Sequence, residues 1–347
     1  MNLKTQVNDR EIFMTAPVID IHNHFVPHSW PNLSERFGGD WPWMKHLNAT
    51  SAMMMYGNSE FRPVTSALWD PIRRIEDMDR DNIDIQVISA TPILFAYARD
   101  AKHSAECARI FNDAALEICE HNPSRLKCLA QVPLQNTELA CLEVTRAMKS
   151  GHLGVQLGNH VGDKDLNDEG ILTVLEHCAK EGAAVLVHPW DMNSHARNKK
   201  YMLQWLVDMP AETELSILSL ILSGAFERLP KSLKLCFAHG GGSFPYLLGR
   251  IDNAWKHRDI VREDCPNIPS SYVNRFYVDS AVFNPGALKL LVDVMGEDQV
   301  MYGSDYPFPL GEQNMGELVR SSNELSSSTK DKILSVNAQK WLGLSLN

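Results

Sequence analysis

The sequence predicts an α/β protein that folds as a (β/α)8 TIM barrel with a small insertion after the first strand. Eight short runs rich in Val, Ile and Leu alternate with segments whose apolar residues recur at helical spacing. This alternation is typical of a parallel sheet covered by helices, and eight such units fit a closed barrel. An open doubly wound sheet is the competing architecture. It would often carry a Gly-rich phosphate loop after its first strand, and none is present there.

The predicted elements follow one another along nearly the whole chain. Residues 1–17 are assigned as an N-terminal extension and residues 18–347 as the barrel. The predicted strands are VIDIHNH at 18–24 and then 83–90, 126–134, 154–158, 183–190, 233–241, 275–281 and 299–307. A helical pattern begins at Pro71, and others lie at 105–122, 138–151 and 169–182. The last two close on Gly151 and Gly182, as helices commonly do.

The insertion comprises about residues 25–70 and fits no regular period. It contains Trp30, Trp41 and Trp43 together with the methionine run at 53–55. We expect it to hold a small apolar cluster of its own. Because long loops inside compact domains are usually functional, we also expect it to contribute to a site.

The overall composition narrows the function classes. Hydrophobic residues at 44% and charged residues at 22% are ordinary for a globular protein, and the net charge of −10 disfavours a nucleic-acid surface. The N-terminal residues contain no apolar stretch long enough for a signal peptide or a membrane helix. The seven cysteines are scattered without CxxC pairs, which predicts reduced thiols in a cytoplasmic protein.

The first strand carries two histidines, His22 and His24, at i, i+2 spacing. Side chains at this spacing point to the same face of a strand, so both imidazoles could bind one metal ion. On a helix the two side chains would lie about 200° apart and could not share an ion. By itself the pattern is weak, since two polar residues can simply end a strand.

The active site of a TIM barrel lies at the carboxyl ends of its strands. Inspection of the predicted strand ends adds three residues to the pair in the first strand: His188, His239 and Asp305. Each of the three alone could be a hydrogen-bonded core residue or a turn residue. Imidazoles with a carboxylate at one rim suit Zn²⁺, while Fe²⁺, Mn²⁺ and Co²⁺ remain open.

These motifs resemble the decarboxylase branch of the amidohydrolase superfamily. The resemblance is carried by HNH at 22–24, HPWDM at 188–192, FAHGGGSFP at 237–245 and GSDYPFPLGE at 303–312. Within that branch it extends from Val18 to Leu344 and is closest to enzymes that act on an amino-carboxymuconate semialdehyde. The stretches that support the closer match are 68–71, 209–227, 247–255 and 287–296.

The resemblance implies a carboxy-lyase that removes CO₂ without oxidation and depends on one Zn²⁺ per chain, with other divalent metals open. It implies the metal ligands His22, His24, His188 and Asp305, with His239 as the acid/base beside the metal. A second ion is not expected. Members with two ions usually carry a bridging lysine at the end of the fourth strand, where this chain offers only Gln156.

The resemblance also implies how a small dicarboxylate semialdehyde would bind. Arg62 would hold a carboxylate, and Arg250 would be contributed to the partner's site in a homodimer. Guanidinium groups match carboxylates bidentately, which suits such a substrate, although a surface salt bridge is the ordinary role of an arginine. The implied apolar pocket positions are Phe61, Trp190, Met192, Trp205 and Phe308. Relatives often have proline where this chain has Gln204, which leaves the local pocket shape open.

Three other functions remain open from the sequence. A related decarboxylase of a hydroxybenzoate could use similar ligands. A hydrolase such as a lactonase would share the fold but release no CO₂. A metal-binding protein without catalysis is the third. The sequence also leaves open whether the pathway is tryptophan catabolism or nitroaromatic degradation.

Overall fold

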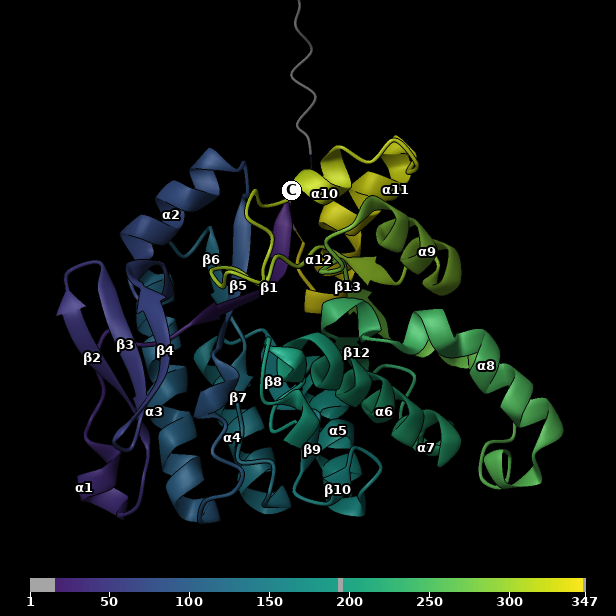
Figure 1. The fold of residues 1–347 in the computed structure, drawn as a ribbon, viewed down its shortest axis with the longest axis horizontal. Helices are drawn as coiled ribbons and strands as arrows, with labels where there is room; N and C mark the ends of the chain where they lie inside the picture. The colour runs from purple at the N-terminus through teal and green to yellow at the C-terminus, as the bar shows by residue number, and fades with distance from the viewer. Residues whose placement is uncertain (1–15, 193–195, 346–347) are drawn as a thin grey trace, which may run out of the picture.

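The computed structural model describes residues 16–192 and 196–345, and its parallel strands follow the order of a TIM barrel (Figure 1). Strand β1 (Ile19–Phe25) pairs with β5 (Ile85–Ala90), which pairs with β6 (Leu126–Cys128). The second parallel sheet runs, in order of pairing, through β7 (Ala130–Gln131), β8 (Gly154–Gly158), β11 (Ala184–His188), β12 (Lys234–Phe237), β13 (Tyr277–Asp279) and β14 (Val300–Met301). All eight predicted strands are confirmed, the third as the two short strands β6 and β7.

Backbone hydrogen bonds connect these two sheets on both sides. Leu129, which lies between β6 and β7, donates its N–H to the carbonyl of Ile88 at 2.9 Å. On the opposite side Ile21 donates to the carbonyl of Tyr302 at 3.0 Å, and Asn23 forms a parallel bridge with Tyr306. Backbone hydrogen bonds therefore close the barrel, although the regular pattern of strand pairing is interrupted at the two places where the sheets meet.

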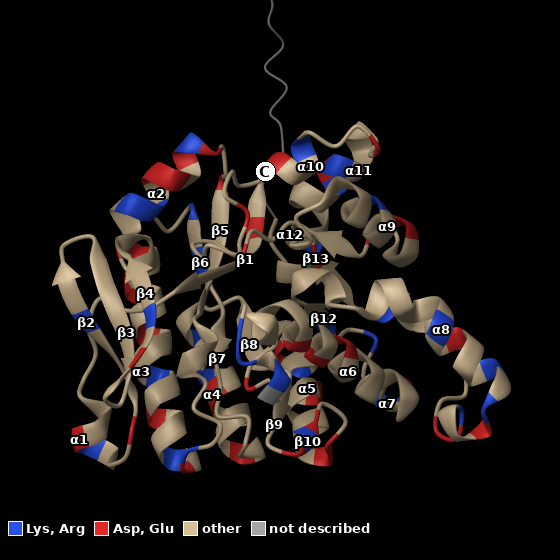
Figure 2. Cartoon of the chain, in the orientation of Figure 1, with Lys and Arg blue, Asp and Glu red and all other residues tan. Residues whose placement is uncertain are grey.

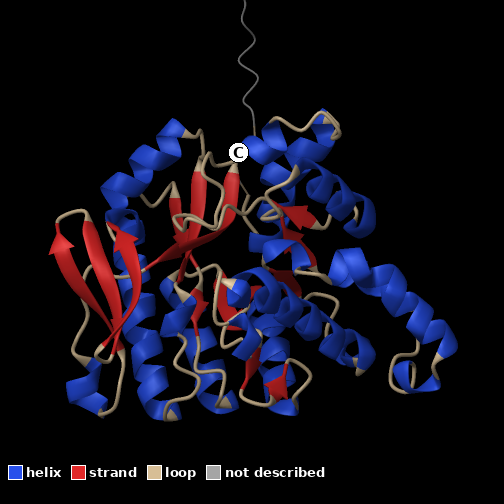
Figure 3. Cartoon of the chain, viewed as in Figure 1, coloured by secondary structure: helices blue, strands red, loops and turns tan. Residues whose placement is uncertain are grey.

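Helices cover the outside of the strands (Figures 1 and 3). Asp70, Asp100, Asn136 and Asp168 cap the first four large helices through side-chain oxygens that accept backbone N–H groups. Gly151 and Gly182 end two of them in the left-handed conformation, as predicted. The large helices are α2 (Pro71–Arg80), α3 (Ala101–Glu120), α4 (Thr137–Ser150), α5 (Glu169–Glu181), α6 (Met209–Leu222), α8 (Phe244–His257) and α9 (Pro285–Met295).

The shorter elements complete the chain. Helices α7 (Ala225–Arg228), α10 (Glu317–Arg320), α11 (Ser327–Asp331) and α12 (Asn337–Leu342) connect or follow the later strands, and β9 (His160–Val161) pairs antiparallel with β10 (Lys164–Asp165). Acidic and basic residues are interspersed along the outer helices, for example on α2 and α8 (Figure 2). Within the described residues, no helix has the length and apolar character to span a membrane.

The insertion is more regular than its sequence suggested. It contains α1 (Leu33–Phe37) and a three-stranded antiparallel sheet that stands beside the barrel (Figure 3), formed by β2 (Pro42–Asn48), β3 (Ser51–Tyr56) and β4 (Ser59–Thr65). The expectation of a separate apolar cluster was wrong. The buried residues Trp41, Met54 and Val64 belong to the same cluster as the residues between the barrel strands and their helices. The insertion is therefore packed against the barrel.

The inside of the barrel is apolar toward the amino-terminal ends of the strands. Ile21, Val87, Leu186 and Met301 form a buried cluster there with Trp341 of α12. The indole of Trp341 donates to the carbonyl of Lys234, the first residue of β12, at 2.8 Å. This end is therefore closed by side chains, and the polar groups inside the barrel gather at the carboxyl ends.

Candidate metal centre and substrate cavity

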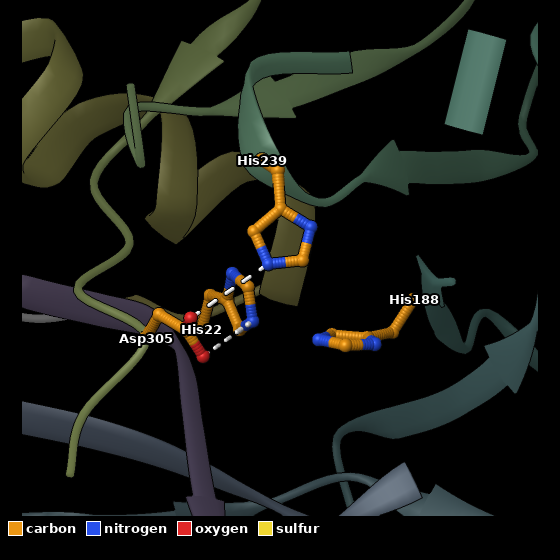
Figure 4. A group of neighbouring side chains, drawn as sticks. All are labelled: His22, His188, His239 and Asp305. Carbon is orange, nitrogen blue, oxygen red and sulfur yellow. Dashed lines mark ion pairs between the residues drawn. The ribbon is translucent and has the colours of Figure 1, made fainter. Parts of the chain in front are cut away.

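Side chains from four strand ends converge at the carboxyl end of the barrel. The ligand atoms of His22, His188, His239 and Asp305 all lie within 4.8 Å of one another (Figure 4). His24 adjoins them, with its Nε2 3.3 Å from Nε2 of His22 and 3.2 Å from Oδ1 of Asp305. The structure therefore brings together all five residues that the strand-end analysis selected.

Strand β1 presents its two histidines through a local irregularity. Its pairing with β5 gains one residue between Asp20 and Asn23, which is the geometry of a β-bulge. His22 lies within this irregularity and His24 directly after it, and the two ring centroids are 5.2 Å apart in an edge-to-face arrangement. The i, i+2 spacing thus predicted their shared face, whereas the bulge was not foreseen.

Asp279, at the end of β13, orients His22. Its Oδ2 lies 2.6 Å from Nδ1 of His22, so Nδ1–H donates to the carboxylate and Nε2 is left facing the cluster. The same carboxylate accepts the backbone N–H groups of His239 at 2.9 Å and of Gly240 at 2.8 Å. Asp279 was not selected from the sequence, although it lies in the predicted strand 275–281 and the strand-end rule could have found it.

His239 and Asp305 both have left-handed backbone conformations, with φ of 55° and 58°. Residues with a Cβ rarely adopt this region, and such strain often accompanies functional sites. Gly303 allows the segment before Asp305 to approach the cluster closely. A Cβ at Gly303 would lie 2.8 Å from Cβ of His22 and 2.9 Å from Cβ of Asp279.

Burial and the neighbouring carboxylates determine the charge of the cluster. Burial lowers the pKa of His24 to about 4 and that of His188 well below its ordinary range, so both imidazoles are neutral near pH 7. For His22 burial acts in the same direction, but the carboxylate of Asp279 outweighs it and raises that pKa to about 9. For Asp305 burial raises the pKa, yet the imidazoles of His239 and His24, whose Nε2 atoms lie 3.8 Å and 3.2 Å from its oxygens, hold that pKa well below its usual range. A cation at Nε2 of His22, whether a proton or a metal ion, is therefore favoured.

A cavity of about 350 Å³ opens beside this cluster. Its wall includes His24, His188, His239 and Asp305 on one side and mainly apolar groups on the other. Five of the predicted substrate contacts line it: Phe61, Arg62, Trp190, Trp205 and Phe308. Further lining residues that were not predicted are Pro63, Thr91, Pro92, Met202, Met209, Pro309 and Leu310. Thr91 and Pro92 directly follow the predicted strand 83–90, so the strand-end rule could have found them as well.

Arg62 is the cationic group of the cavity wall. Its guanidinium carbon lies 4.6 Å from the ring centroid of Phe308, 5.4 Å from that of Phe61 and 5.8 Å from that of Trp205. Burial lowers its pKa, and the Asp305 carboxylate acts in the opposite direction. The aromatic faces hold the guanidinium while leaving its N–H groups for a ligand.

Two predicted contacts do not line this cavity. Met192 is buried, with 5% of its surface exposed, and does not belong to the cavity wall. Arg250 lies on the exposed part of α8, outside the cavity of its own chain. Gln204 begins the π-helical turn Gln204–Asp208, and its side-chain amide contacts the carbonyl of Met192 at 3.4 Å.

The side chain of Gln156 on β8 forms hydrogen bonds inside the barrel. Its side-chain amide donates to the carbonyl of Ala90 at 2.7 Å, and its oxygen accepts the hydroxyl of Ser89 at 2.7 Å. The position where a lysine would bridge two ions therefore carries an amide whose groups bond to neighbouring residues.

Comparison with known proteins identifies the family. A family model described as Amidohydrolase matches residues 19–344. The Dictyostelium discoideum protein named 2-amino-3-carboxymuconate-6-semialdehyde decarboxylase is 43% identical over 332 residues, which cover 95% of this chain and 92% of that relative.

Solved structures share the fold. The apo form of Metarhizium anisopliae IDCase superposes with a TM-score of 0.80 at 23% identity, over 94% of this chain and 97% of that chain. The dihydroxybenzoic acid decarboxylase of a Polaromonas species, solved with manganese and 2-nitroresorcinol, gives 0.74 at 21% identity, over 94% and 97%. Since the family model covers nearly the whole chain and the Dictyostelium relative is 43% identical, this chain belongs to the amidohydrolase family.

Proposed function

We propose that this protein is a metal-dependent, non-oxidative decarboxylase that converts 2-amino-3-carboxymuconate-6-semialdehyde to 2-aminomuconate-6-semialdehyde. The observation that carries the proposal is the cavity, whose wall combines residues of the histidine and aspartate cluster with the guanidinium of Arg62 among mainly apolar groups. The name of the Dictyostelium relative supports this substrate. The seven free cysteines support a reducing compartment, and we place the enzyme in the cytoplasm.

The residues present fit one divalent ion. Neutral imidazoles and an ionised carboxylate are the donors that Zn²⁺ prefers, and they also accept Mn²⁺. We assign His22, His24, His188 and Asp305 as ligands of Zn²⁺ and His239 as the acid/base. The side chains of His22 and His24 are fully buried, whereas 13% of the His239 side chain is exposed. A proton-transfer group must reach the substrate, so the most accessible histidine of the cluster suits that role.

The ion would supply Lewis acidity, which makes hydroxide available from water near neutral pH. His239 accepts the proton that this water loses. Decarboxylation replaces the C–CO₂⁻ bond of the substrate with a C–H bond, so a proton must reach that carbon as CO₂ leaves. His239 would deliver there the proton that it accepted, which restores the conjugated system with CO₂ as the second product.

Arg62 is assigned to one substrate carboxylate. Its guanidinium is held between Phe308, Phe61 and Trp205 beside the cluster, so it can pair with an anion without leaving the cavity wall. We assign the second carboxylate to Arg250 of a partner subunit in a homodimer. The exposed position of Arg250 on α8 supports a role outside its own cavity.

The decisive experiment combines metal analysis with a CO₂-release assay. Purified protein loaded with Zn²⁺ or Mn²⁺ is given the semialdehyde, prepared enzymatically, and in parallel a panel of hydroxybenzoates. We expect loss of the semialdehyde absorbance with release of one CO₂ per substrate and no turnover of the panel. Turnover of a hydroxybenzoate alone would favour the related decarboxylases, and hydrolysis of a lactone without CO₂ would favour a hydrolase.

A further inference from the structure

We propose that Arg74 of α2 is a positioning residue for the metal centre, although it touches neither the cavity nor the five clustered side chains. This inference rests on the proposed function only in assuming that the cluster binds a metal ion. Arg74 is 1% exposed and is among the largest fully buried side chains in the described residues. A buried guanidinium is costly to desolvate, so the contacts that it makes there call for an explanation.

Arg74 holds the backbone that carries His24. One terminal nitrogen, Nη2, donates to the carbonyl of His24 itself and to the carbonyl of Ala67 at 3.2 Å. The other, Nη1, donates to Oδ1 of Asn23 at 3.0 Å and to Oε1 of Gln86 at 2.8 Å. The guanidinium thus connects β1, β5 and the last part of the insertion.

The same guanidinium contacts the segment that carries Asp305. Its carbon lies 5.0 Å from the ring centroid of Tyr306, the residue after Asp305. Tyr306 is fixed in turn, because its hydroxyl donates to Oδ2 of Asp77 on α2 at 2.8 Å. Arg74 therefore lies between the backbone of His24, one predicted ligand, and Tyr306, the neighbour of the predicted ligand Asp305.

A second route leads from Arg74 to Asp305 through Gln86. The amide of Gln86 donates to Oδ2 of Asp20 at 2.9 Å. Asp20 also accepts the hydroxyl of Ser304 at 2.7 Å and the backbone N–H of Ser304 at 3.1 Å. Ser304 directly precedes Asp305, so this network supports both sides of the ligand.

The fork of an arginine explains why this residue type is present. Two terminal nitrogens in one plane can satisfy four acceptors at once, whereas the single ammonium of lysine cannot. If Arg74 only stabilised the fold, its loss would lower the unfolding temperature and leave metal affinity unchanged. If it positions His24 and Asp305, its loss weakens metal binding in protein that is still folded.

The test measures Zn²⁺ affinity without substrate. Full-length, metal-stripped protein competes for Zn²⁺ with a chromogenic chelator, and thermal unfolding is recorded for each variant. We expect Arg74→Met to bind Zn²⁺ about 10- to 100-fold more weakly, the range typical for residues that support metal ligands. Arg228→Met is the matched control. Arg228 lies on α7, its side chain is 42% exposed and it pairs with Glu169 and Glu176, away from this network, so the parent affinity should be retained.

Arg74→Lys keeps the charge and decides the question if Arg74→Met does not fold. We expect it to lose Zn²⁺ affinity as well, because lysine cannot span the same acceptors. Parent affinity in either folded Arg74 variant, even with a lowered unfolding temperature, would overturn the proposal. Because no substrate is used, the Zn²⁺ affinity does not depend on the outcome of the CO₂-release assay. The role of Arg74 can therefore be tested even if the protein does not catalyse the proposed reaction.

Discussion

The metal centre and the substrate cavity share one wall but are built from different parts of the chain. The centre is formed at the ends of short strands, and His22 is locked by a buried carboxylate at 2.6 Å. Much of the rest of the cavity comes from the insertion, from residues in and around the π-helical turn Gln204–Asp208 and from the segment after Asp305, with Arg62 held by aromatic rings. Under the proposed function, chemistry would therefore be placed on the rigid barrel and substrate recognition on segments that can differ between relatives. Changes in one region should therefore leave the other intact.

The largest expected effect is the loss of turnover in His239→Ala. This substitution distinguishes a residue that takes part in catalysis from one that binds the metal. His239→Ala should leave metal content unchanged and lower turnover by about 10²- to 10⁴-fold, the usual contribution of a general acid/base. Metal content by elemental analysis and turnover by absorbance decay measure the two effects. His257→Ala, at an exposed position on α8, is the control. Loss of the metal in His239→Ala would instead make His239 a ligand, and normal turnover with full metal would remove it from the mechanism.

The next effect concerns the metal centre alone. Asp279→Asn keeps the shape of the side chain but removes the charge that favours a cation on His22, so Zn²⁺ affinity should fall by about 10- to 100-fold. Chelator competition measures it. Asp293→Asn changes a carboxylate on α9 that is 57% exposed and pairs with Lys289, and it should leave the affinity unchanged. An unaltered affinity in Asp279→Asn would show that His22 needs no such support.

A smaller effect concerns the cavity alone. Arg62→Met removes a charged hydrogen-bond donor, which should raise KM roughly tenfold while Zn²⁺ affinity stays at the parent value. Steady-state kinetics at saturating metal provide the measurement. Arg36→Met in α1 serves as comparison, since Arg36 lies in the same insertion but pairs with Glu106. The separation of the two regions would fail if Arg62→Met also lost metal.

The smallest effect lies outside both regions. His152 is 2% exposed, and burial lowers its pKa, although its Nδ1–H donates to the carbonyl of Ala147 at 3.2 Å and acts in the opposite direction. The folded protein therefore holds this imidazole neutral, and its contribution to stability is lost as the pH falls below the ordinary histidine pKa of about 6.5. In metal-free protein, His152→Gln should show a flatter fall of the unfolding temperature between neutral and acidic pH. The exposed His121→Gln should keep the slope of the parent, and an equal slope in His152→Gln would exclude this contribution.

The positions that could be predicted are those specified by local patterns. Strands of a parallel barrel read as continuous apolar runs, and their carboxyl ends meet at one rim, so His22, His188 and Asp305 could be grouped without knowing any contact. The helices at 138–151 and 169–182 could be bounded because Gly151 and Gly182 end them through a conformation that glycine favours. The sheet in the insertion was not predicted, because apolar and polar residues alternate only weakly along its strands. In β3, for example, the buried residues are Ala52, Met54 and Met55, which do not follow a strict alternation.

Other features arise only from the tertiary structure, because they depend on residues far apart in the sequence. Asp279 is 257 positions from His22, and Arg74 is 50 positions from His24, so no local period reveals either contact. The cavity wall excludes Met192 although it lies two residues after Trp190, since the backbone between them turns through Asp191 at a φ of 63°. The sequence by itself determined the barrel and the residue types at its rim, because apolar periodicity and strand ends are local properties. Only the tertiary structure decided which groups support those residues and which of them face the cavity, because packing across the barrel sets both.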